Sequence, residues 1–422
     1  MLVLVIALQV IALLVRGVKL GTGSTALIAT SVGLSLAAAT ATLALPPIAL
    51  DRIRALARAL VRTPPRAGLF VFAAAVAVLG SNVYLQQPDA WDERGILGAA
   101  RLIAAGGPGG LAHAYRDNAW LGPQHPPLGP LVYACAWRLG ATTPTALRWL
   151  SVLVASGALL AAWRVLSRFL EGPTAVVATA LLLTSPLVVR VGSAVGNDGL
   201  LLLLFWLALV CGLRLVEAPS KGRAAVLGLV LLLGALTKYT MIFIAPLLPI
   251  LPWATGRRWP RPTHLAITVS IAASSAGWLL AMDHLGILER QVSTLAGIAS
   301  TSAHAWRWAA ISVLVSLPSA AGIYSVPVLL QGLAHLRPRR ARGEAWLAVW
   351  ILAVALPVSL TLPTNRFFLP AFPAISAISA LGLERGFASD DRVRAALLLG
   401  SFCAVTLLYY ASADLRIPMN RF

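Results

Sequence analysis

PDAWDERGILGAARLIAAGGPGGLAHAYRDNAWLGPQHPPL, residues 88–128, is the longest polar segment of an otherwise apolar chain. It holds the adjacent acids Asp92 and Glu93, several glycines and prolines, and a final His-Pro-Pro. In a membrane protein, carboxylates that lie beside the hydrocarbon are candidates for function by default. The side of the membrane on which this segment lies, and the residues that join it there, therefore decide how the rest of the chain is interpreted.

The composition excludes a soluble protein. Of 422 residues, 59% are hydrophobic and only 12% are charged, about half the usual share for a soluble domain. The mean hydropathy is +0.82, and several apolar runs approach or exceed the ~20 residues that a membrane-spanning helix needs. The sequence therefore predicts an all-α polytopic membrane protein with no separate soluble domain.

The net charge of +19 favours a membrane over nucleic acid as the partner. The basic residues form short clusters between apolar runs, which is typical of topology signals and of contacts with anionic headgroups. The cysteines Cys135, Cys211 and Cys403 are far apart and show no metal or redox spacing, so we expect small core residues. Residues 1–15 lack a basic n-region, which favours a retained span, with a cleaved signal as the alternative.

Arginine clusters predict the topology. The segment 51–66, DRIRALARALVRTPPR, holds five arginines and marks the cytoplasmic side. The next span leads outward, which places residues 88–128 on the extracytoplasmic side. We expect about thirteen spans (eleven to thirteen), with the N-terminus inside and the C-terminus outside: 1–15, 24–50, 67–86, 146–163, 173–191, 199–213, two within 224–253, 264–282, 306–334, 345–362, 366–383 and 395–413.

The apolar stretch 224–253 contains Lys238 and could form one long helix or a hairpin of two short ones. A single span would place Arg257, Arg258 and Arg261 outside, whereas a hairpin keeps them inside with the other basic clusters. We therefore expect a hairpin with Lys238 at its outer turn. With it, the cytoplasmic segments hold 20 of the 34 basic residues, packed into short loops.

Two short helices are expected near the outer surface. Over 92–105, Arg94 and Arg101 share one face, which is typical of a helix that lies on the membrane. The run Gly106–Gly110 is expected to end this helix. The stretch 127–140 is too short to span comfortably and is expected to be re-entrant or interfacial. The opposite, apolar face of the first helix carries Ile96, Leu97, Ala100 and Ile103.

Four polar features lie at predicted extracytoplasmic helix ends: the Asp92-Glu93 pair, Asp198, Lys238 and Arg366. Each also has a local explanation. Asp92 could cap a helix, Asp198 could begin one, and Lys238 could extend its ammonium to the interface. Arg366 could be an ordinary cation at a helix boundary. His125, a further candidate, could be a loop histidine before a Pro-Pro turn.

Together these residues suggest group transfer. A carboxylate that faces outward can accept a proton from an acceptor hydroxyl or amine. Lys238 and Arg366 can hold a phosphate, the first as a point charge and the second as a fork. The amphipathic helix leaves a lateral opening for a lipid tail. The set therefore predicts a transferase that uses a lipid-phosphate-linked donor.

These elements, in this order and spacing, resemble the GT-C superfamily of membrane glycosyltransferases, and most of all the protein O-mannosyltransferases and the lipid A aminoarabinose transferases. The resemblance covers about 91–383, roughly seven tenths of the chain. The matching motifs are WDERGILGAARLIAAGG (91–107), His-Pro-Pro-Leu (125–128), Ala146-Leu147-Arg148, SPLVVRVGSAVGND (185–198), ALTKY (235–239) and NRFFLPAFP (365–373).

The resemblance implies inverting transfer of a sugar from a polyprenyl-phosphate carrier to a protein, glycan or lipid acceptor on the extracytoplasmic face. It implies Asp92 as the catalytic base with Glu93 beside it. Asp198, Lys238, Arg366 and His125 would then bind substrate. The domains expected are an N-terminal hairpin and basic loop (1–66), a GT-C-like catalytic module (67–383) and a C-terminal loop with the last helix (384–422), in the plasma (inner) membrane.

Two other functions remain as alternatives. A transporter or flippase of a lipid-linked or small anionic solute usually shows internal repeats and ionisable residues near mid-membrane, and this sequence shows neither. A catalytically inactive membrane subunit would use the acids as capping residues only. No cofactor is certain, and a divalent Mg²⁺ or Mn²⁺ between carboxylates and phosphate stays open.

Overall fold

The computed structural model describes residues 55, 64–81, 83, 91–117, 125–183, 185–293, 329, 332–336, 342–360 and 365–387. Within these ranges the backbone forms helices and no strand, which confirms the all-helical class. The predicted spans 1–15, 24–50 and 395–413 and nearly all of 306–334 lie outside the described residues. The total of thirteen therefore stays a prediction.

Five helices in the described part of the chain are long and apolar enough to cross a membrane. Their existence confirms a multi-pass membrane protein, because each supplies the ~20 apolar residues that crossing requires. Three shorter apolar helices accompany them, at Arg66–Ser81, Gly172–Leu183 and Tyr239–Thr255. The five longer ones are Pro144–Phe169, Asn197–Glu217, Pro262–His284, Arg342–Ser359 and Arg366–Gly386.

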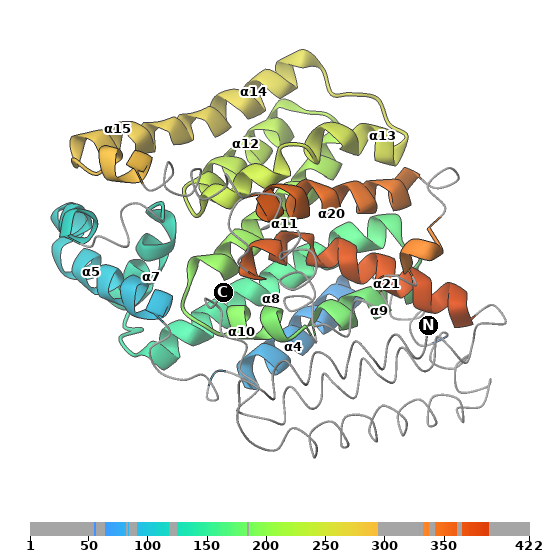
Figure 1. Cartoon of the computed structure of the whole chain (residues 1–422), viewed down its shortest axis with the longest axis horizontal. Coiled ribbons are helices and arrows are strands. Elements are labelled where there is room, and N and C mark those ends of the chain that lie inside the picture. The colour runs from blue at the N-terminus through green and yellow to red at the C-terminus, as the bar shows by residue number, and fades with distance from the viewer. Residues whose placement is uncertain are drawn as a thin grey trace.

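A large apolar core fills the centre of the bundle, whose helices are seen in Figure 1. Helix α8 packs against both α4 and α11, and α21 packs against α9. Large side chains that are fully buried fill the core, among them Phe205, Trp206, Trp346 and Trp350. The helices have the bounds α4 Pro64–Ser81, α8 Pro144–Phe169, α9 Gly172–Leu183, α11 Asn197–Glu217, α20 Arg342–Leu360 and α21 Phe372–Phe387.

The predicted single span 173–191 is wrong, because the chain breaks into α9 and a short α10 (Pro186–Gly192). Pro186 has no backbone N–H to continue a helix, and it disfavours helical geometry in the residue before it. Ser185 accordingly has an extended backbone, with φ −65° and ψ 121°. The break lets α10 turn the chain toward the first residues of α11.

The expected hairpin at Lys238 is present. Helix α12 (Lys221–Ala235) runs back along α11, and the backbone of Lys238 is extended, with φ −162° and ψ 138°. The chain then returns toward the other end of α11, where Gly212 lies against Leu248 and Leu251. The returning arm consists of η1 (Tyr239–Ile244), η2 (Leu248–Ile250) and α13 (Leu251–Thr255).

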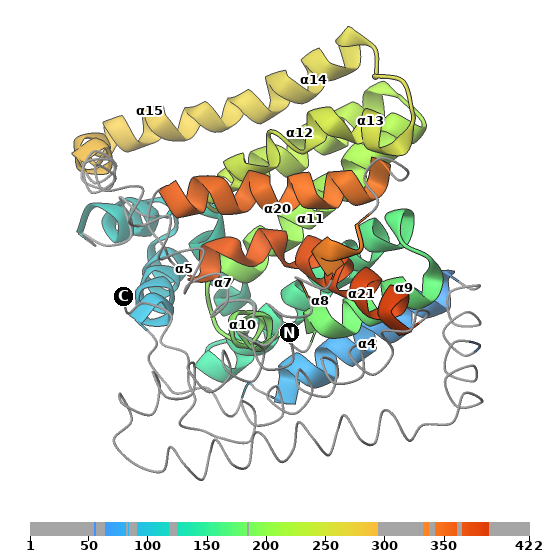
Figure 2. The ribbon, with the colours of Figure 1, turned by 45° about the vertical axis from the view of Figure 1, so that its right-hand side comes forward.

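An outer layer covers this hairpin. Helices α14 (Pro262–Ala273) and α15 (Gly277–His284) follow one another across a short 3₁₀ turn, η3 (Ser274–Ala276), and α14 packs on α12 (Figure 2). This confirms the predicted span 264–282. Most of its side chains are exposed in the isolated chain, as expected for an apolar helix that faces lipid.

The two surface helices lie together at one end of the bundle, α5 (Trp91–Asp117) against α7 (Leu128–Arg138) (Figure 1). The predicted faces of α5 are confirmed, since Arg94 and Arg101 are exposed. Its predicted end is confirmed, because the first helical segment stops within the run Gly106–Gly110, but a second segment that was not predicted follows it. The chain kinks at Gly107 (φ 57°, ψ −132°) and Pro108 then begins a second helical segment. The four predicted apolar positions, Ile96, Leu97, Ala100 and Ile103, are all buried.

Helix α7 has the short length expected of a re-entrant or interfacial helix. It shares a second, smaller core with α5 and the start of α8. Cys135 on α7 is exposed, so the expectation of a core residue is wrong there. The reason is that α7 buries one side only, whereas Cys211 lies in the fully packed α11 and is buried. Cys403 lies outside the described residues.

The chain enters α21 through a 3₁₀ segment, η6 (Asn365–Ala371), which carries Arg366. Two indoles fix this segment to the core. The Nε1 atoms of Trp206 and Trp350 both donate to the carbonyl oxygen of Pro370, at 3.2 and 3.0 Å. Arg366 therefore sits four residues from a rigid anchor, at the end of the bundle where α11 begins.

Candidate functional site

Four charged side chains from four separate elements meet in one cluster. Lys238, at the hairpin turn, forms an ion pair with Asp198 in the first turn of α11. Arg366 on η6 forms an ion pair with Asp92 on α5, and its guanidinium is also 3.7 Å from Asp198. The predicted convergence of Asp92, Asp198, Lys238 and Arg366 is confirmed as geometry.

The cluster forms one wall of a pocket. Asp92, Asp198 and Arg366 line it, and Glu93 and His125 contribute as well. The other lining residues are Ile96 on α5 and the turn that joins α10 to α11. Because Lys238, Asp198 and Arg366 are almost buried, their charges interact in a setting of low dielectric where unpaired charge is costly. The four charges balance, two positive against two negative.

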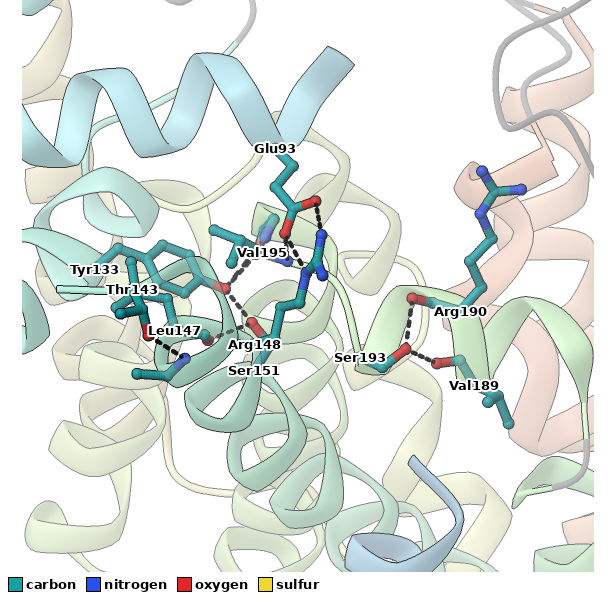
Figure 3. Close-up of polar contacts among 12 residues, drawn as sticks. Glu93, Tyr133, Thr143, Leu147, Arg148, Ser151, Val189, Arg190, Ser193 and Val195 are labelled. Carbon is teal, nitrogen blue, oxygen red and sulfur yellow. Dashed lines mark hydrogen bonds and ion pairs between the residues drawn. The ribbon is translucent and has the colours of Figure 1, made fainter. Parts of the chain in front are cut away.

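Glu93 has a different environment from its neighbour Asp92. Its carboxylate accepts two hydrogen bonds from Arg148 on α8, from Nε at 2.8 Å and from Nη2 at 2.9 Å (Figure 3). The backbone N–H of Val195 also donates to it, at 3.4 Å. Both partners of the pair are buried. This geometry favours a positioning role for Glu93 over the catalytic role that the sequence suggested.

The turn before Asp198 is held from two sides. Glu93 accepts from Val195, and the hydroxyl of Tyr133 on α7 accepts from the backbone N–H of Gly196, at 3.2 Å. The same hydroxyl lies 2.8 Å from Oγ of Ser151 on α8 (Figure 3). Helices α5, α7 and α8 thus fix the entry to α11 and with it the position of Asp198.

His125 lies at the same site. Its carbonyl oxygen accepts from the hydroxyl of Tyr115, at 3.0 Å, and its side chain is buried. Three residues later, the N–H of Leu128 donates to the carbonyl of Leu236, just before Lys238. Burial lowers the pKa of His125 to about 3, and the nearby charge of Lys238 contributes. The imidazole is therefore neutral at physiological pH.

This pKa predicts a pH-dependent stability. Because folding lowers the pKa from its ordinary 6.5, the native state resists protonation, and stability is lost as the pH falls from about 6.5 toward 3. The loss from His125 alone should reach about 2 kcal/mol at pH 5. Thermal denaturation in detergent at pH 8 and pH 5 would measure it. His125→Asn should lose less over this range than the wild type, and equal losses in both proteins would contradict the assignment.

The charged cluster was predicted from the sequence, but the residues that fix its position were not. Arg148 was noted only as part of a motif, although an arginine one turn inside an apolar helix is a signal that a buried partner exists. Tyr133 gave no signal, because a tyrosine in a short apolar helix is ordinary.

The site offers few ligand atoms for a divalent cation. Asp92 and Asp198 supply carboxylate oxygens, the type that Mg²⁺ and Mn²⁺ prefer. In the part of the chain that the structure describes, no group of three or more His, Cys, Asp and Glu side chains converges. Both carboxylates also contact Arg366, which occupies the place between them. The described residues alone therefore do not fit a resident metal.

Part of the chain matches a protein-family model. Residues 124–280 match the model of the dolichyl-phosphate-mannose-protein mannosyltransferases. This range begins beside His125 and includes Asp198 and Lys238, two members of the charged cluster. Among curated proteins, none matches the sequence.

Solved structures share the fold. ArnT from Cupriavidus metallidurans in the apo state is 16% identical over 75% of this chain and 59% of its own, with a TM-score of 0.54. ArnT bound to undecaprenyl phosphate is 16% identical over 81% and 64%, with a TM-score of 0.50. An Archaeoglobus fulgidus oligosaccharyltransferase, solved with Zn and sulfate, is 15% identical over 80% and 52%, with a TM-score of 0.46. The chain spans about three fifths of the length of apo ArnT.

Proposed function

We propose that this chain is a membrane glycosyltransferase of the GT-C superfamily, and that it transfers a sugar from a polyprenyl-phosphate donor to an acceptor hydroxyl or amine. The observation that carries this proposal is the bridge that Arg366 forms between Asp92 and Asp198, with Lys238 beside it.

The cations suit the donor phosphate. An arginine fork and a lysine ammonium are the usual partners of phosphate oxygens. Both are already paired with acids and lie in a site that excludes most water. An entering phosphate would replace carboxylates as the partner of Arg366 and Lys238. Such an exchange keeps the two buried cations compensated, and it releases Asp92 for chemistry.

Asp92 then acts as the general base. Its carboxylate accepts the proton of the acceptor while the acceptor oxygen or nitrogen forms a bond to the anomeric carbon of the sugar. The bond between that carbon and the phosphate oxygen breaks, and the electron pair leaves with polyprenyl phosphate. Attack opposite the leaving group inverts the anomeric centre. Lys238 and Arg366 stabilise the charge that develops on the phosphate.

The arginine distribution supports an extracytoplasmic site. In the described residues, the end of the bundle opposite the charged cluster carries the ion pairs Arg168–Glu217 and Arg385–Glu344 in segments predicted to be cytoplasmic. We propose that residues 67–383 form the catalytic module in the inner membrane, with 1–66 and 384–422 flanking it. A donor lipid would enter beside α5.

A binding experiment with the purified full-length chain tests the proposal. Wild type should bind undecaprenyl phosphate, and Lys238→Met should bind it about 10- to 100-fold more weakly, because a charge-assisted hydrogen bond contributes about 1.5–3 kcal/mol. The measurement is a ligand-induced shift of thermal denaturation. Lys221→Gln, an exposed change at the other end of α12, is the matched control.

Two results would contradict the proposal. One is a wild type that does not bind undecaprenyl phosphate, and the other is Lys238→Met binding as tightly as wild type. Reconstitution with a glycosylated carrier separates the transporter alternative. A glycosyltransferase leaves free undecaprenyl phosphate and a glycosylated acceptor, whereas a flippase moves the intact lipid across the bilayer.

A further inference from the structure

Asn197 is a polar group of the pocket that the proposed chemistry does not use. It is the first residue of α11, next to Asp198, and it lines the same pocket as Asp92 and Arg366. Its side chain is 3% exposed, and within the described residues neither Oδ1 nor Nδ2 has a hydrogen-bond partner. A buried amide left this way costs about 1–3 kcal/mol, so its retention requires an explanation.

The neighbouring helix makes room for this amide. Gly129, buried near the start of α7, lies so close that an added β-carbon would be 1.8 Å from Oδ1 of Asn197 and 2.7 Å from Cγ. The Asn197 amide itself would have to move to relieve such an overlap. A glycine at this position therefore leaves room for the Asn197 amide at the pocket wall.

We propose that the side-chain amide of Asn197 hydrogen-bonds a hydroxyl group of the sugar on the donor, and so contributes to sugar recognition. This inference rests on the proposed function. An amide both donates and accepts, which matches a hydroxyl. A phosphate only accepts, and Lys238 and Arg366 already supply the charge that suits it. A hydrogen bond to a sugar hydroxyl would satisfy the buried amide only when the glycosylated donor is bound.

The test compares carriers with and without sugar. The probes are undecaprenyl phosphate alone and the same carrier bearing mannose, glucose or aminoarabinose, each titrated into the purified full-length chain. Wild type should bind at least one glycosylated carrier more tightly than the bare one. Asn197→Leu, close in volume but without hydrogen-bonding atoms, should bind the bare carrier within about twofold of wild type and the preferred glycosylated carrier about tenfold more weakly.

Two further measurements guard against a folding artefact. Asn197→Leu should denature at the same temperature as wild type or above it, because an unsatisfied amide has been removed from the interior. Gly129→Ala should reproduce the selective loss by displacing the amide. Gly98→Ala on α5, where an added β-carbon meets nothing within 4 Å, is the control and should bind both carriers as wild type does.

The outcomes that overturn the inference differ from those that overturn the proposed function. If Asn197→Leu weakens the binding of bare and glycosylated carriers equally, or weakens neither, sugar recognition by Asn197 is refuted. The proposed function is not affected by either result. The same holds if wild type binds bare and glycosylated carriers equally. A wild type that binds none of the carriers would refute the proposed function and this inference with it.

Discussion

Asp92→Asn is expected to lower the rate of sugar transfer by about 10²- to 10⁴-fold, the range that a positioned general base supplies. Asparagine has nearly the same shape but cannot accept the acceptor's proton. The protein should still insert and fold, because the asparagine oxygen can still accept from Arg366 and Arg366 stays within reach of Asp198. The measurement is turnover of a glycosylated undecaprenyl phosphate by the purified protein.

Binding of the bare carrier gives a second result for the same variant. If the phosphate displaces the Asp92 carboxylate from Arg366, loss of that carboxylate's charge should make undecaprenyl phosphate bind somewhat more tightly. Rate and affinity therefore move in opposite directions, which a merely unfolded variant cannot mimic. Asp117→Asn, an exposed change at the far end of α5, is the control. Full activity of Asp92→Asn would refute the base assignment, whereas no turnover by the wild type would favour an inactive subunit.

The charged cluster could be predicted from the sequence because Asp92 stands in the one long polar segment and the other three members lie within or beside apolar runs. Asp198 and Lys238 stand beside long leucine-rich segments, where an ionised side chain is expensive without a partner. The hairpin followed from the positive-inside rule, since only a return of the chain kept three arginines with the other basic clusters. The free-energy cost of an unpaired charge beside an apolar segment thus indicates that the charge has a partner elsewhere in the chain.

Other features had no such local signal. The break at Pro186 was missed because the apolar pattern continues across it, and periodicity alone does not weigh a missing backbone N–H. The Gly-Gly-Pro-Gly-Gly run at 106–110 predicted the end of the first helical segment, but not the second segment that begins at Pro108. The role proposed for the Asn197 amide could not be predicted, because an asparagine at the start of a helix is typical of a capping residue. Its burial and its closeness to Gly129 are known only from the structure.

The second large expected effect is a loss of stability when the ion pair between Glu93 and Arg148 is broken. Arg148→Met should destabilise the protein by about 3–5 kcal/mol, because it leaves the buried carboxylate of Glu93 without its ion-pair partner. Thermal denaturation in detergent measures this. Glu217→Gln, which breaks the exposed pair with Arg168, should cost no more than about 1 kcal/mol and is the matched control.

The double variant decides between positioning and catalysis. Glu93→Gln combined with Arg148→Met removes both charges, while the glutamine oxygen can still accept from the N–H of Val195. If Glu93 positions the turn before Asp198, the double variant should recover much of the stability and of the transfer rate that Arg148→Met loses. If Glu93 exchanges protons with substrate, stability should return without activity. The geometry favours the first result, because the hydrogen bonds of this carboxylate within the described residues are structural: they come from Arg148 and from the backbone of Val195.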